Sequence, residues 1–153
     1  MKRPAWPNVE QFPAHGLRDR TPGWVPQVWT TRLPAGRHWD AIRVHRPDAL
    51  QALQLLGYGI GPVIANPYAQ VHFFLLDQLH EPWEATRTAR LLRHGTVIAV
   101  PQWHVRNGRD VHWAVPPGRG ATDPDDLHEA LARRQPQPRR PLASPAAKRR
   151  PKP

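Results

Sequence analysis

The sequence predicts one compact α+β domain, built as a mostly antiparallel sheet with helices on one face. Short segments rich in Val, Ile and aromatic residues are spaced along the middle of the chain, and two longer segments carry helix start signals. The chain has 153 residues, of which 39% are hydrophobic, and this suits a single core. Its 20 prolines predict long connections between the elements.

Residues 1–36 are predicted to form a proline-rich lead-in that packs on the domain. Trp6, Trp24 and Trp29 are spaced along this segment, and we expect their side chains to anchor it to the core. Stacking on nucleic-acid bases is an alternative role for these rings. A short strand is predicted over residues 28–32.

The compact domain is predicted to span residues 37–134. Alternation of apolar residues predicts three strands in its first half, over residues 39–45, 62–65 and 71–76. In the third of these strands His72 alternates with Phe74 and Leu76, which predicts a half-buried imidazole on one face of the sheet.

A helix is predicted over residues 47–56, between the first two strands. Pro47 suits the first helical position, and the glycine-rich segment 57–61 provides a C-cap and turn. Because this segment follows a helix, it lacks the helix N-terminus that a phosphate-binding loop uses. Leu50 and Leu53 share a face of the helix, which is therefore expected to be buried.

The second half is predicted to contain a helix, a hairpin and a final helix. The helix covers residues 82–93. Strands over residues 96–100 and 110–115 flank Asn107 and Gly108, a pair of residues that favours a two-residue turn and so pairs the two strands with each other.

The last helix is predicted to begin at Asp123 and to end in Arg133 and Arg134. Acidic side chains at its start and basic ones at its end both complement the helix dipole. The face expected to be buried carries Leu127, Ala130 and Leu131.

Residues 135–153 are predicted to form a disordered basic tail. The segment contains six prolines, six basic residues and no acid, so it holds six of the ten net positive charges of the chain. It supplies most of the residues that we expect to bind nucleic acid: Arg139, Arg140, Lys148, Arg149, Arg150 and Lys152, together with Arg133 and Arg134 before it.

The excess of arginine is compatible with a polyanionic partner. A guanidinium group binds phosphate through two parallel hydrogen bonds. The alternative is that Arg, Ala and Pro are abundant together because the genome is rich in GC, without selection for binding.

Several classes of protein are excluded. The chain has no Cys, so disulfides, thiolate zinc sites and thiol nucleophiles are absent. No apolar run is long enough to span a membrane, and we expect a cytoplasmic protein that binds no membrane. The nine histidines show no metal-binding spacing, and Ser144 in the tail has no nucleophile motif around it. We therefore expect no metal, no cofactor and no catalytic residue.

Residues 39–131 resemble the bifunctional primase-polymerase (prim-pol) domain of high-GC bacteria. In that family a strand with an acidic metal motif leads into a helix, as residues 39–45 lead into residues 47–56. A later strand with Gly-x-His and aromatic residues resembles Gln-Val-His-Phe-Phe at residues 70–74. The segment 95–108 is similar to the following hairpin of the family. The resemblance implies an RRM-like half of a prim-pol fold.

The chain departs from the family at the metal site. Arg43, Val44 and His45 stand where the metal-binding acids are expected, and no acid stands at the third position, in residues 91–97. Basic and apolar side chains cannot hold Mg²⁺ as carboxylates do. The resemblance thus implies a degenerate active site in which His72 alone matches the histidine that contacts nucleotide.

These observations together favour a non-catalytic, prim-pol-like accessory module that is associated with DNA. Its basic residues would contact nucleic acid through the tail and through a sheet face around Arg43, His45 and His72. The main alternative is a protein-interaction or structural module of a replication or mobile-element system, which does not touch nucleic acid itself. An active nucleotidyl transferase with relocated acids, such as Asp40 and Asp77, is the third possibility.

Overall fold

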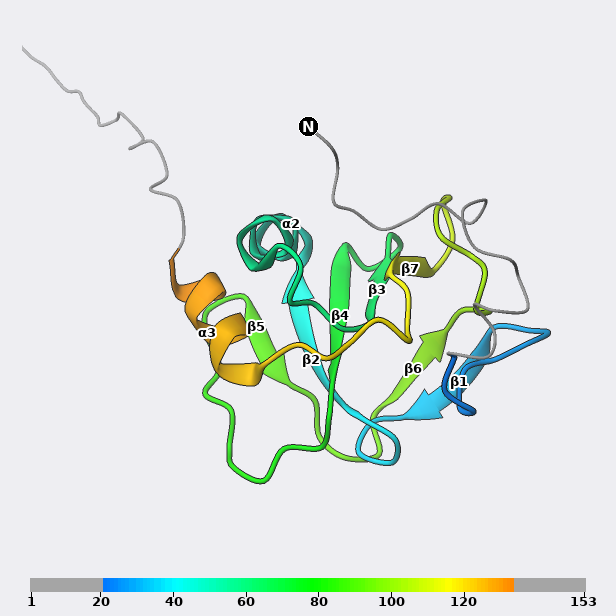
Figure 1. Cartoon of the computed structure of the whole chain (residues 1–153), viewed down its shortest axis with the longest axis horizontal. Helices are drawn as coiled ribbons and strands as arrows, with labels where there is room; N and C mark the ends of the chain where they lie inside the picture. The colour runs from blue at the N-terminus through cyan, green and yellow to red at the C-terminus, as the bar shows by residue number, and fades with distance from the viewer. Residues whose placement is uncertain (1–20, 134–153) are drawn as a thin grey trace, which may run out of the picture.

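The computed structural model of the chain describes residues 21–133, which form two sheets and two helices (Figure 1). In chain order the elements are β1 (Thr31–Pro34), β2 (Asp40–His45), α2 (Arg46–Leu56), β3 (Val63–Asn66), β4 (Val71–Leu76), β5 (Ala89–Leu91), β6 (Val97–Val100), β7 (His112–Val115) and α3 (Pro124–Ala132). None of these helices has the length and apolar character that crossing a membrane requires.

The main sheet has the strand order β5-β2-β4-β3-β7, and every neighbouring pair in it is antiparallel. A second, two-stranded sheet pairs β1 with β6. The prediction of a mostly antiparallel α+β fold is therefore confirmed.

Both helices cover the same face of the main sheet, as predicted. Ala49 and Ala52 of α2 and Leu127 of α3 are buried in one cluster with Ile42 and Phe74 of the central strands. The opposite face packs against β1, β6 and a group of tryptophans (Trp24, Trp39 and Trp113). In Figure 1 the helices lie on the left and the two-stranded sheet lies on the right. The main sheet thus has a helix face and a tryptophan face.

Helix α2 begins one residue earlier than predicted and ends where predicted, and the side of it that is buried differs from the expected one. Pro47 lies in its first turn, and Gly57 ends it with a φ of 62°, a left-handed conformation that costs glycine little. The fully buried residues are the small Ala49 and Ala52, whereas Leu50 is 45% exposed. The expected burial of Leu50 is wrong, because close packing of α2 on the sheet selects the alanine face.

Helix α3 follows its prediction closely. The side chain of Asp123 accepts hydrogen bonds from the backbone N–H groups of Asp125 and Asp126, and this caps the helix. The residues expected to be buried, Leu127, Ala130 and Leu131, are buried.

The helix predicted over residues 82–93 is wrong. Residues 77–88 form an irregular connection, and Ala89–Leu91 form strand β5, which pairs with the outer edge of β2. Trp83 lies against the helix-side core and donates a hydrogen bond from its indole Nε1 to the carbonyl of Pro124. Pairing with an open strand edge and anchoring by Trp83 outweigh a weak helical pattern.

The hairpin predicted across Asn107 and Gly108 is also wrong. Strand β6 pairs with β1, and β7 pairs with β3, so the two segments belong to different sheets. The backbone N–H of Trp113 does donate to the carbonyl of Val105, but no strand pairing extends from this bond in the described residues. The local turn signal is overridden by pairing with strands distant in sequence.

The N-terminal tryptophans have different environments. Trp24 packs against Trp39 and Trp113, which confirms its role as an anchor. Trp29 is 76% exposed, so its anchoring role is wrong. Trp6 lies outside the described residues. The strand predicted over residues 28–32 is found slightly later, at Thr31–Pro34.

Candidate functional site

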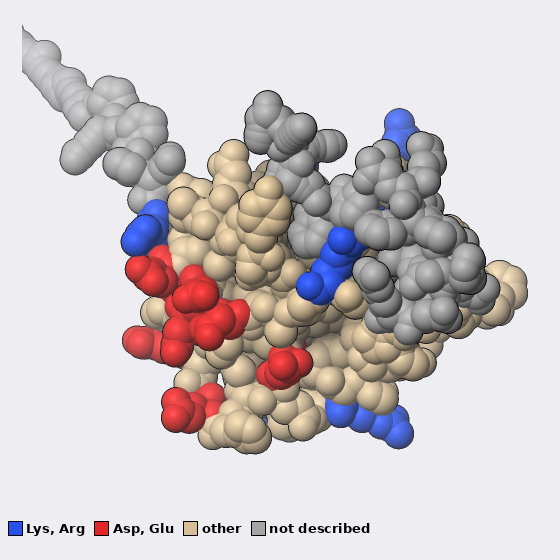
Figure 2. Space-filling view, in the orientation of Figure 1, with Lys and Arg blue, Asp and Glu red and all other residues tan. Residues whose placement is uncertain are grey.

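The charges of the described residues are strongly segregated. Residues 21–133 contain eleven arginines and ten acidic residues, a net charge of +1, although the whole chain carries +10. Seven of the ten acids belong to α3, to the residue that caps it or to the connection before β5. They are Asp77, Glu81, Glu84, Asp123, Asp125, Asp126 and Glu129. Figure 2 shows most of the red surface on the left of the view, with smaller separate red patches beside it.

The other three described acids are engaged by nearby groups. Buried Asp40 accepts a hydrogen bond from the backbone N–H of Leu79, at 2.7 Å, and its other oxygen lies 3.0 Å from Nε2 of His94. Asp48 accepts from the hydroxyl of Thr88, and Asp110 accepts from the hydroxyl of Tyr68. Within residues 21–133, Arg43, Arg46, Arg90 and Arg109 form no ion pair with any of these acids.

A cavity of about 490 Å³ lies between α2 and the β3–β7 side of the sheet. We name it the basic pocket and define it by Arg46, Leu53, Ala65, His72, Arg109 and His112. Its floor is a row across three strands, in which Ala65 of β3 pairs with His72 of β4 on one side and with His112 of β7 on the other. Because the alanine between them is small, both imidazoles face the same space.

Two arginines and a helix N-terminus add positive charge to this pocket. Arg46 begins α2, and Arg109 comes from the loop before β7; neither forms an ion pair in residues 21–133. His45, at the N-cap of α2, makes no side-chain capping bond. No carboxylate is among the residues that line the pocket. The arrangement suits an anion, because both guanidinium groups and the dipole of α2 attract one.

The two histidines of the pocket differ in their surroundings. His72 is 5% exposed, its Nδ1 has no hydrogen-bond partner within residues 21–133, and burial lowers the pKa of its imidazole below 6.5. The charges of Arg46 and His112 lower this pKa further, against an opposing contribution from the Val71 backbone. Nδ1 of His112 donates to the carbonyl of Asp110 at 2.8 Å, so Nε2 becomes a donor when the ring is protonated. An anion in the pocket would stabilise the protonated form of His72.

The loops at the mouth of the pocket are held together. Gln70 has a φ of 57°, which is rare for a residue with a side chain, and its carbonyl accepts from the N–H of Arg46. The bond from Tyr68 to Asp110 joins the β3–β4 turn to the loop before β7 and, with the Asp110 charge, raises the pKa of the phenol. In the same loop, burial lowers the pKa of Arg106.

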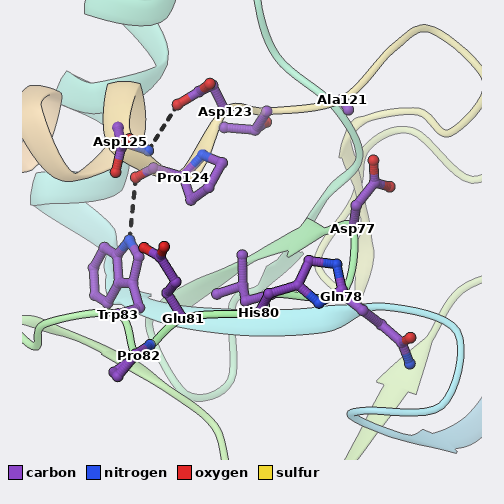
Figure 3. Close-up of a pocket in the computed structure, with 12 residues that line it drawn as sticks. Asp77, Gln78, His80, Glu81, Pro82, Trp83, Ala121, Asp123, Pro124 and Asp125 are labelled. Atoms are coloured by element: carbon purple, nitrogen blue, oxygen red, sulfur yellow. Dashed lines mark hydrogen bonds between the residues drawn. The ribbon is translucent and has the colours of Figure 1, made fainter.

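A second cavity, of about 510 Å³, has the opposite character (Figure 3). We name it the acidic pocket and define it by Asp77, Glu81, Trp83, Asp123 and Asp125. Figure 3 shows the caps of α3 on one side of it and Asp77 on the other. Within residues 21–133, no group of three His, Asp or Glu side chains is arranged to hold a metal ion.

The structure separates the residues that we expected to share one sheet face. Val44 is the partner of His72 on the helix face, so Arg43 and His45, which alternate with Val44, lie on the tryptophan face. Arg43 is half-buried and His45 is exposed. Arg133 forms an ion pair with Glu129 at 3.1 Å. The other predicted nucleic-acid contacts lie outside the described residues: Arg134, Arg139, Arg140, Lys148, Arg149, Arg150 and Lys152.

The acids considered for catalysis do not meet His72. Asp40 pairs with Leu76, four residues along β4 from His72, a separation of about 13 Å. Asp77 is an exposed residue that follows β4 and lines the acidic pocket. The described residues thus place these two acids at the opposite end of the sheet from the basic pocket.

Sequence reasoning missed three residues of the basic pocket: Arg46, Arg109 and His112. The predicted hairpin placed His112 opposite Trp103, away from His72. For Arg46 the sequence did hold a weaker signal. The strand before it and the helix after it were both predicted, so Arg46 could have been placed at the start of the helix, near the end of the sheet.

Comparisons with protein-family models, with curated proteins and with solved structures find no match to this chain.

Proposed function

We propose that the chain is a non-catalytic, prim-pol-like accessory module that binds nucleic acid through phosphate groups. The observation that carries this proposal is the basic pocket, a cavity lined by two histidines and by two arginines that form no ion pair within residues 21–133, with no carboxylate among the described residues that line it. Its volume of about 490 Å³ lies in the range of small-ligand sites. The apolar side chains of Leu50 and Leu53 beside the charged groups suit a base next to its phosphate.

The basic segment 135–153 supports the same proposal through its composition. Six basic residues without an acid can neutralise several phosphates, independently of base sequence. The pocket would then hold one nucleotide, while the segment would contribute charge along the rest of the strand.

The direct test is charge reversal in the pocket. In the full chain, Arg46→Glu with Arg109→Glu should weaken binding of a fluorescent single-stranded oligonucleotide at about 50 mM salt and lower the salt slope by about 1.4, because two phosphate contacts are lost. Arg37→Glu is the matched control, since Arg37 is exposed and does not line the pocket. An equal loss in the control variant would show that only net charge matters.

The non-catalytic part of the proposal has its own test. With Mg²⁺ or Mn²⁺ and nucleotides, the purified chain should neither synthesise nor extend a primer, because Asp40 and Asp77 lie far from His72. Incorporation that depends on the template and is abolished by Asp77→Asn would overturn it.

The alternative function, a protein-interaction module of a replication or mobile-element system, is favoured by one observation. Val28 and Trp29 are adjacent, apolar and 58% and 76% exposed, and exposed aromatic residues are common in protein interfaces. Absence of any binding to nucleic acid at about 50 mM salt, where charges are little screened, would make this the better account.

A further inference from the structure

Arg43 and Arg90 face each other across two neighbouring strands. Arg43 in β2 is the register partner of Arg90 in β5, and such partners share a sheet face with their Cα atoms about 4.5–5.5 Å apart. Neither guanidinium forms an ion pair within residues 21–133. Like charges in this position oppose strand pairing. The pair is better explained by a ligand than by a role in the fold.

The tryptophan face is open beside this pair. The row across the sheet that contains Arg90 and Arg43 continues through Phe73, Ile64 and Trp113. Those three residues are buried with the β1–β6 layer, whereas Arg43 is half-buried and Arg90 is exposed. The second layer therefore covers the β4-β3-β7 part of this face and leaves basic side chains accessible at the β2–β5 edge.

The same face leads to the basic pocket at the end of the sheet. His45, the last residue of β2, is exposed and lies on the same side as Arg43. The next residue, Arg46, begins α2 and lines the basic pocket on the other side of the sheet. Basic side chains thus follow one another from Arg90 through Arg43 and His45 to Arg46.

We propose that a single-stranded nucleic acid follows this path around the end of the sheet, with one phosphate held between Arg43 and Arg90. The inference rests on the proposed function and adds to it the form of the nucleic acid and the role of Arg90. Two adjacent guanidinium groups can donate several charge-assisted hydrogen bonds to one phosphate. A duplex, with a persistence length of about 50 nm, is too stiff to turn from one face of a sheet to the other.

The test compares Arg90→Glu with Arg93→Glu in the full chain. Arg93 is exposed and follows the other end of β5, so it controls for the change in net charge. Arg90→Glu and Arg43→Glu should each weaken binding of a single strand of about 12 nucleotides roughly tenfold, and lower the salt slope by about 0.7. Arg93→Glu should have a much smaller effect. The duplex of the same sequence should bind more weakly and respond little to Arg90→Glu.

Other results of these binding measurements would reject different parts of the proposal. Equal losses in Arg90→Glu and Arg93→Glu would reject the arginine clamp, and equal binding of duplex and single strand would reject the path while leaving the proposed function intact. Failure to bind any nucleic acid would reject both. Preference for an acidic peptide, lost in Arg90→Glu, would assign the surface to a protein partner. Arg90→Gln, which removes repulsion, should keep or raise the Tm and still weaken binding, so loss of folding is separable from loss of contact.

Discussion

Two pockets formed by residues 21–133, the basic pocket of about 490 Å³ and the acidic pocket of about 510 Å³, are lined by side chains of opposite charge. In the acidic pocket the side chains of Asp123 and Trp83 stabilise the fold, because Asp123 caps α3 and Trp83 donates a hydrogen bond to the Pro124 carbonyl. In the basic pocket, and within the part of the chain that the structure describes, Arg46 and Arg109 form no ion pair and Nδ1 of His72 has no hydrogen-bond partner. Groups that stabilise nothing within the domain are better candidates for binding than groups already satisfied.

The largest expected effect comes from removing the basic segment 135–153, and it shows how much of the binding to nucleic acid depends on residues outside the two pockets. Truncation after Arg134 removes six basic residues, so the slope of log K against log salt for single-stranded DNA should fall by about 4. Residual binding should remain in the truncated protein and should still depend on Arg46 and Arg109. Salt titrations of the two proteins measure this. Loss of all binding on truncation would assign recognition to the tail alone.

A pH titration sharpens the role of the histidines in the basic pocket. The pKa of His72 is lowered below 6.5, so below pH 6.5 the unfolded chain takes up a proton before the folded one, and stability from this group is lost as pH falls. A bound phosphate favours the protonated ring. Affinity should therefore rise as pH falls toward the lowered pKa of His72, at most about tenfold per unit for one proton.

The control for this titration is His72→Gln, which keeps Arg46, Arg109 and His112 in the pocket. Fluorescence anisotropy from about pH 7.5 to 5.5 should show a shallower dependence in the variant. An unchanged profile would mean that other histidines carry the effect.

The smallest expected effect is on the free energy of unfolding. It tests whether side chains of the acidic pocket stabilise the fold while those of the basic pocket do not. Asp123→Ala should lower the free energy of unfolding by about 1 kcal/mol, because α3 loses its N-cap. Arg109→Ala should change it by less than about 0.5 kcal/mol, since Arg109 is exposed and makes no ion pair in the described part of the chain. Urea denaturation compares the two. A large loss in Arg109→Ala would give this arginine a structural role.

Several helices and strands could be predicted from signals that lie within a few neighbouring residues of the sequence. Apolar alternation located β2 and β4, Pro47 and Gly57 bounded α2, and Asp123 marked the start of α3. Each of these features depends on bonds or contacts within a few residues, so it is legible without knowledge of the fold. The same holds for the charge of the tail and for His72 as a strand residue on an apolar face.

The choice of strand partners was decided only by the tertiary structure. Asn107 and Gly108 favour a local turn, yet β6 pairs with β1 and β7 with β3 because these pairings bury both faces of the main sheet. That choice brings His112 beside His72. The cross-strand register likewise turns Arg43 away from His72 and toward Arg90. The sequence of a strand shows which of its own side chains share a face. Which residues of other strands lie beside them depends on strand pairing and register, and these are decided by packing between segments distant in sequence.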